Sequence, residues 1–239
     1  MRKYPILLLV FLLTGCASTL RTAPTYSSSI KEIKTIAVMP PDIKVYKITA
    51  GGVQELIDEW SDEAKQYIKE ALERHLSQTQ GVAIKFVDEK WLKENHKDIW
   101  RKNRALYSAI SMSALLHAYP GENEFPAKRK NFDYTLGPDI KELSQVCEGD
   151  ALLFIYGFDN EATVGRQALW WFNITMALAT GVAYLPINPS GMAVGLVNAQ
   201  TGNLEWLKVT PADTEYSFRN SKSMDTLIEW ITRDLAKKK

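Results

Sequence analysis

The sequence has few cysteines and no excess of charge of either sign. Its only two cysteines are Cys16, near the start, and Cys147, in the middle of the chain. The 29 lysines and arginines are balanced by 28 aspartates and glutamates, which gives a formal net charge of +1. This balance excludes the strongly basic footprint of a nucleic-acid-binding protein. We therefore expect no nucleic acid among its partners.

Recognisable catalytic motifs are also missing. The sequence contains no HExxH, CxxC or GxSxG pattern, and its glycines form no phosphate-binding loop. The three histidines, His75, His96 and His117, are widely spaced along the chain. We expect His75 to lie near a helix end rather than to act as a ligand. The sequence therefore predicts no catalytic residue, no metal ligand and no cofactor.

The N-terminal region has no apolar run long enough to cross a membrane. Residues 6–13 form an apolar run of eight residues, whereas a spanning helix needs about 20. Arg2 and Lys3 precede this run, and Thr14 and Gly15 follow it. A basic start, a short apolar run and small residues before a cleavage point are typical of an exported signal peptide.

The end of this run, Leu13-Thr14-Gly15-Cys16, resembles the lipobox of bacterial lipoproteins. The resemblance implies that residues 1–15 are removed and that Cys16 becomes a lipid-modified N-terminus, with palmitate-type acyl chains. Two or more acyl chains anchor a protein stably without a membrane-spanning helix. Ala17 stands where inner-membrane lipoproteins of enteric-type bacteria carry aspartate, which favours the periplasmic face of the outer membrane. The alternative is an ordinary secretory peptide with a chance cysteine.

The remaining cysteine, Cys147, has no partner for an intramolecular disulfide if Cys16 carries lipid. We expect the Cys147 thiol to be buried. The alternatives are a reactive thiol and an intermolecular bridge.

The chain after residue 15 divides into a short polar segment and a long folded region. Residues 16–32 are small and polar, which predicts a flexible tether with a root-mean-square span of about 20 Å. Residues 33–239 are expected to form a single α/β domain. An apolar insertion at 167–190 interrupts this domain before its last elements.

Hydrophobic patterning predicts alternating strands and helices in this domain. Short apolar runs predict buried strands at 34–41, 150–157 and 192–197, with further strands at 82–88 and 204–209, the last of which alternates and pairs back as a hairpin. Apolar residues three and four apart predict helices at 53–76, 90–119 and 221–235, with a shorter helix at 137–147. The fold class is α/β, with a mixed sheet of about five strands flanked by helices and ending in a β-hairpin and a final helix. If the first two strands are parallel, the strand–helix–strand order forms a right-handed α/β layer.

Three segments resemble a known family. They are the strand Ile36-Ala37-Val38-Met39-Pro40, the stretch 133–153, and the hairpin segment 196–206. In this order they resemble uncharacterised bacterial lipoproteins related to the curli secretion channel lipoprotein. The penicillin-binding-protein activator lipoproteins and the TolB amino-terminal domain share a similar fold. The resemblance covers about residues 34–235 and implies a fold and an envelope location, although Asn198 replaces an aspartate that is usual in the relatives.

A long stretch, residues 167–204, contains no charged residue. Its first half, 168–187, could be packed inside the protein, could dip into the membrane, or could form a subunit interface. The candidate contact residues for membrane or partner are Trp170, Trp171, Phe172 and Tyr184, since aromatic side chains favour the membrane–water interface. The segment does not alternate apolar with polar residues as a barrel strand must, which argues against a pore.

The sequence thus predicts a membrane-anchored bacterial lipoprotein that faces the periplasm. We expect a non-enzymatic binding or envelope-assembly factor, whose partner is an envelope protein or a second copy of the chain. The first alternative is an oligomeric secretion-pore subunit, and the second is an envelope hydrolase. The basic triplet Lys128-Arg129-Lys130 is expected in a solvated loop, with contact to lipid headgroups as the alternative.

Overall fold

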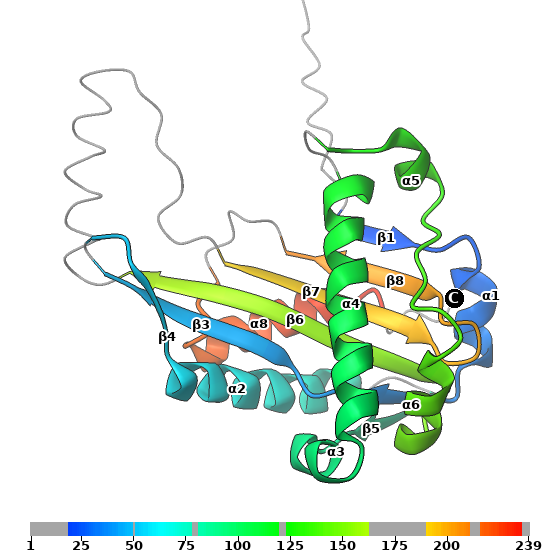
Figure 1. The fold of residues 1–239 in the computed structure, drawn as a ribbon, viewed down its shortest axis with the longest axis horizontal. Coiled ribbons are helices and arrows are strands. Elements are labelled where there is room, and N and C mark those ends of the chain that lie inside the picture. Colours follow the sequence, from blue (N-terminus) through cyan, green and yellow to red (C-terminus); the bar gives the residue numbers. More distant parts are fainter. Residues whose placement is uncertain are drawn as a thin grey trace, which may run out of the picture.

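The fold is a mixed β-sheet with helices on both faces, seen in a computed structural model of the chain (Figure 1). The structure describes residues 19–49, 51–77, 81–119, 123–162, 190–210 and 216–235. Its strands are β1 (Leu20–Thr22), β2 (Thr35–Val38), β3 (Asp42–Ile48), β4 (Gln54–Leu56), β5 (Ala83–Phe86), β6 (Ala151–Ala162), β7 (Gly191–Asn198) and β8 (Leu204–Val209). The helices are α1 (Tyr26–Glu32), α2 (Asp58–Leu76), α3 (Glu89–Asn95), α4 (Lys97–Ala118), α5 (Pro126–Lys130), α6 (Ile140–Cys147) and α8 (Ser221–Thr232).

The sheet is organised around the long strand β6. The strand order is β1-β8-β7-β6-β2-β5, while β3 continues beside the second half of β6 and β4 pairs with β3. Strands β2 and β5 are parallel, which meets the condition for a right-handed α/β layer, and β7 and β8 form the predicted antiparallel hairpin. The mixed α/β class is therefore confirmed, but the expected number of five strands is too low, because the described sheet has eight.

The strand β3 is absent from the sequence prediction, because the Pro40-Pro41 pair predicts the end of regular structure. Proline removes a ladder hydrogen bond and therefore does end β2. The next residues nevertheless alternate between buried and partly exposed, with Ile43 and Val45 buried. This alternation is a strand pattern, and it places β3 parallel to β6 from Asp42 opposite Tyr156 onward.

The helix predicted at 53–76 begins later than expected. Residues Gln54–Leu56 form β4, which pairs antiparallel with β3, and Val53 is 65 % exposed. Their apolar side chains fit the helical spacing by coincidence and do not join the buried face of α2. Ser61 lies inside the first turn of α2, where its hydroxyl donates to the Ile57 carbonyl.

The segment 16–32 is predicted to be a flexible tether, and its described part is folded instead. Strand β1 pairs with β8, and α1 follows with Ile30 buried in the core. The hydroxyls of Thr25 and Ser29 donate to the buried carboxylate of Glu205 at 2.8 and 3.0 Å. The small polar residues that suggested a linker are therefore the ones that satisfy a buried acid in β8.

The helices form two layers, one on each face of the sheet (Figure 1). Helices α2 and α8 cover one face, where Ile36 and Val38 of β2 point into the core. Helices α4 and α6 cover the other face, where Ala37 and Met39 do the same. The run that forms β2 is thus buried on both faces, as expected, whereas the edge strand β5 alternates between exposed and partly buried residues. The single helix predicted at 90–119 is two helices, α3 and α4, and the basic triplet expected in a loop belongs to α5.

Candidate functional site

The candidate residues from the sequence lie outside the described part of the chain. Cys16 precedes the first described residue, Thr19, by three positions. The aromatic set Trp170, Trp171, Phe172 and Tyr184 belongs to the segment 163–189, which is also outside it. The site is therefore built from the described residues that flank these positions.

The point where the described chain begins is fixed to the edge of the sheet. The carbonyl of Thr19 accepts a hydrogen bond from the backbone N–H of Val209 at 2.9 Å, just before β1 pairs with β8. Successive Cα atoms are 3.8 Å apart, so the Cα atom of Cys16 lies within about 11 Å of that of Thr19. Any group attached to Cys16 is therefore held close to this edge.

Arg21 of β1 connects this edge to the C-terminal end of α4. Its Nε donates to the Ala118 carbonyl at 2.7 Å, and its guanidinium lies 5.0 Å from the centre of the Tyr119 ring. The Tyr119 hydroxyl donates to the Leu207 carbonyl at 2.8 Å. Burial raises the pKa of this hydroxyl, so it remains a hydrogen-bond donor at physiological pH. The first strand and the end of α4 therefore form one connected unit.

The surface beside this unit is apolar and basic. Phe125 stacks on His117 with ring centres 4.3 Å apart, and its backbone N–H donates to the His117 carbonyl. Phe125, Leu116 and Met112 are large hydrophobic side chains that remain exposed. The triplet expected in a solvated loop, Lys128-Arg129-Lys130, forms the last turn of α5.

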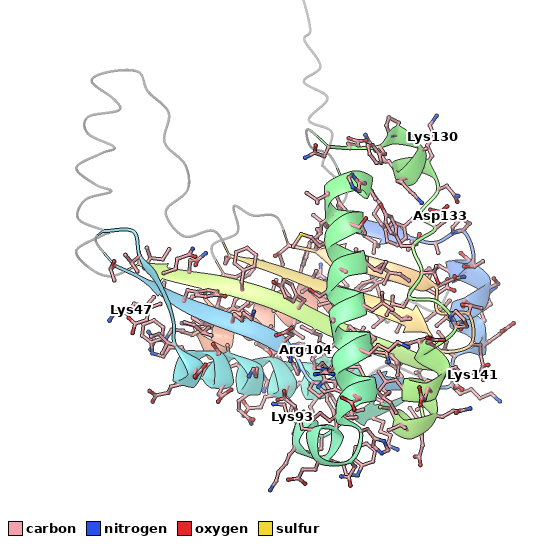
Figure 2. The ribbon with its side chains drawn as sticks, viewed as in Figure 1. Lys47, Lys93, Arg104, Lys130, Asp133 and Lys141 are labelled. Carbon is pink, nitrogen blue, oxygen red and sulfur yellow. The ribbon has the colours of Figure 1, made fainter. Side chains whose placement is uncertain are left out.

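A cavity of about 570 Å³ lies at the opposite end of α4. Figure 2 shows Lys93 and Arg104 at this end of the helix, far from Lys130. Arg104 makes a two-point ion pair with Asp42 at the start of β3, with N–O distances of 2.9 and 2.5 Å. The lining includes Lys93, Lys97, Trp100, Arg101, Arg104 and Asp42. The cavity therefore presents four cationic side chains and one acidic side chain.

The charge of this cavity suits an anionic group. Lys93 pairs with Glu89 and Arg101 pairs with Asp98, both outside the lining, while Lys97 has no ion-pair partner within the described ranges. Sequence reasoning missed the cavity, although Lys97, Arg101 and Arg104 are spaced by four and three residues and so share a helix face. Its acidic member, Asp42, comes from a distant strand and could not be assigned from helical spacing.

The histidines and the second cysteine have structural contacts. His75 lies in the last turn of α2, with Nε2 2.9 Å from the carboxylate of Asp225, which also accepts from Arg74. This arginine is the main reason that the pKa of Asp225 is lowered. Cys147 is buried, as expected, and burial raises its pKa to about 11, so it is a neutral thiol.

Metal-ligand clusters and membrane-spanning helices are both absent from the described residues. These residues contain no group of three or more His, Cys, Asp or Glu side chains arranged to hold a metal ion. In the same part of the chain, no helix combines the length and apolar character needed to span a bilayer.

Comparison with known proteins gives only distant likenesses. No protein-family profile matches the chain, and no curated protein sequence matches it. Among solved structures, the PelC dodecamer from Paraburkholderia phytofirmans has a TM-score of 0.35 and 9 % identity, over 90 % of this chain and 94 % of that one.

Two further solved structures are comparable. Lipoprotein GNA1162 from Neisseria meningitidis has a TM-score of 0.31 and 12 % identity, over 84 % of this chain and 96 % of that one. The LpoB C-terminal domain from Salmonella enterica has a TM-score of 0.27 and 10 % identity, over 81 % and 93 % respectively. These scores and identities are too low to carry a conclusion about function, and the chain is similar to these bacterial proteins only in that limited sense.

Proposed function

We propose that this protein is a lipid-anchored binding or assembly factor of the bacterial envelope that faces the periplasm. Its anchor is lipid on Cys16, and its partner-binding site is the cationic cavity at the N-terminal end of α4. The role is non-enzymatic, and the partner contributes an acidic group.

One observation carries the proposal, namely the three-residue separation between the lipobox cysteine and a strand of the sheet. Thr19 is already hydrogen-bonded to β8, so lipid on Cys16 would hold the whole domain at the membrane surface. Acyl chains anchor a protein strongly when there are two or more of them. The short separation therefore favours a factor that works at the membrane over one that reaches far from it.

The position of the cavity supports the binding role. Helix α4 has 22 residues, and its C-terminal end is joined to β1 through Arg21. The cavity lies near the other end of this helix, with Arg104 paired to Asp42. With the first strand held at the membrane, this arrangement would turn the cavity toward the periplasm, where soluble or envelope partners can reach it.

The anchor is tested by replacing each cysteine in turn in the full-length protein. We expect Cys16→Ser to abolish incorporation of an alkyne-labelled fatty acid and to move the protein from the membrane fraction to the soluble fraction. Cys147→Ser is the matched control, because that thiol is buried and has a raised pKa. We expect Cys147→Ser to leave both the labelling and the fractionation unchanged.

A labelled, membrane-bound Cys16→Ser protein would contradict the anchor. The oligomeric secretion-pore alternative makes a different prediction, namely rings that resist detergent. The solution mass of the full-length lipidated protein in mild detergent separates the two, since a monomer supports the binding factor and a ring supports the pore.

A further inference from the structure

We propose that the C-terminal end of α4, together with Phe125 and α5, rests on the phospholipid surface as a second membrane contact. We call Met112, Leu116, Phe125 and the triplet Lys128-Arg129-Lys130 the membrane face. This inference rests on the lipid anchor proposed for Cys16, and it adds a fixed orientation of the domain on the bilayer.

The strand nearest the anchor and the membrane face are attached to the same part of α4. Arg21 binds the Ala118 carbonyl, and Phe125 binds the carbonyl of the adjacent residue, His117. The strand that follows Cys16 and the Phe125 side chain are therefore attached to the same turn of α4. Since no more than about 11 Å can separate the Cα atoms of Cys16 and Thr19, lipid on Cys16 would bring this turn to the bilayer surface.

The membrane face exposes large apolar side chains. Phe125, Leu116 and Met112 are 54 %, 47 % and 45 % exposed. They are half of the six large hydrophobic side chains that are exposed among the described residues, and all three lie on the last two turns of α4 or directly against them. Met112 and Leu116 are four residues apart and so share one helix face. Exposed apolar clusters of this kind mark contact surfaces.

The basic residues of the membrane face complement the negative charge of anionic phospholipids. Lys128 and Arg129 pair with Asp133 and Glu124, whereas Lys130 has no ion-pair partner in the described ranges and lies at the outer end of α5 (Figure 2). Basic residues next to exposed aromatic and aliphatic side chains are typical of segments that lie in the headgroup region of anionic membranes. The chemistry of the face therefore fits phospholipid rather than a purely apolar protein surface.

Contact between the membrane face and the bilayer would fix the orientation of the domain. Arg104 is twelve residues before Leu116, which corresponds to about 18 Å along the axis of α4. With Leu116 in the headgroup region, the cavity would lie well above the bilayer. Labels near the cavity and labels on the membrane face should therefore report different distances from lipid.

The experiment uses the full-length lipidated protein in vesicles of phosphatidylethanolamine and phosphatidylglycerol. In a Cys147→Ser background, a fluorophore is attached at Leu116→Cys or, as the matched control on the same helix, at Arg101→Cys. Some vesicles contain lipids with a nitroxide on the headgroup, which quenches nearby fluorophores. We expect the label at position 116 to lose most of its emission and the label at position 101 to keep most of its emission.

Three outcomes overturn the inference. Equal quenching at the two positions would mean that the domain has no fixed orientation. Floating protein with no quenching at position 116 would mean that solvent or a second copy covers the face. Failure to float with the vesicles would refute the Cys16 anchor itself. This failure can be told apart from failure of the membrane face, because flotation is measured before quenching.

A second set of variants tests the face without touching the anchor. The triple variant Met112→Ser, Leu116→Ser, Phe125→Ser should still float, because Cys16 is intact. With the fluorophore moved to Lys130→Cys, we expect this variant to lose the quenching that the parent shows at that position. Retained quenching in the triple variant would contradict a role for the three apolar side chains.

Discussion

Gly202→Ala is expected to lower the free energy of unfolding by about 2–5 kcal/mol, the sum of a backbone penalty and a steric clash. Gly202 has φ 75°, a conformation that residues with a Cβ atom adopt only at a cost. A Cβ atom at this position would lie 2.1 Å from the carbonyl oxygen of Gly137. The turn cannot move away easily, because the Gly202 N–H donates to the Asn198 carbonyl and its own carbonyl accepts from Leu136.

The matched control for this change is Gly81→Ala. Gly81 has the same φ of 75°, but a Cβ atom there would meet nothing within 4 Å. We expect this variant to lose only about 1–2 kcal/mol, the cost of the left-handed backbone alone. Urea unfolding followed by circular dichroism gives both values. Equal losses in the two variants would show that the 196–206 hairpin is not held against Gly137.

The second large effect is a dependence of stability on pH that comes from Asp159 in β6. The carboxyl group is buried and accepts a hydrogen bond from the Phe218 N–H at 2.8 Å. Burial is the main cause that raises its pKa from 3.8 to about 6. The folded state therefore binds this proton more tightly than the unfolded state does. Between about pH 4 and pH 6 the free energy of unfolding should fall by about 3 kcal/mol as pH rises.

Asp159→Asn isolates this contribution, because the amide oxygen can still accept from Phe218 and does not titrate. Relative to the variant, the parent protein should lose stability through this pH window and then remain level above pH 7. Asp139→Asn is the control, since the exposed Asp139 pairs with Lys102, which lowers its pKa. A difference between parent and Asp159→Asn that does not change with pH would refute the assignment.

The core of the fold could be predicted from the sequence, because short apolar runs report burial directly. The runs that form β2, β6, β7 and β8 are recognisable in this way. The segment that forms β1 and α1 is not, because its hydroxyls resemble a linker until Glu205 is placed beside them. That contact joins residues about 180 positions apart, and local patterning carries no information about it.

The candidate site also has parts that the sequence predicts and a contact that it does not predict. Cys16 can be recognised from the few residues around it, and the spacing of Lys97, Arg101 and Arg104 is enough to define a basic helix face. The contact between Arg21 and Ala118, which orients the domain relative to the anchor, spans 97 positions. It depends on the sheet order, so only the fold could bring β1 to the turn of α4 that also holds Phe125.

The short strand β1 also has a consequence for how this protein can be handled in the laboratory. If residues 16–32 were taken for a linker, a recombinant form would be started at residue 33. This form lacks β1, the strand that pairs with β8 at Trp206, Leu207 and Lys208. Unpaired backbone groups along a strand act as a template for pairing with another chain. The trimmed protein would also lack the two hydroxyls that donate to Glu205. Such a preparation is expected to aggregate, so a soluble form should begin no later than Thr19.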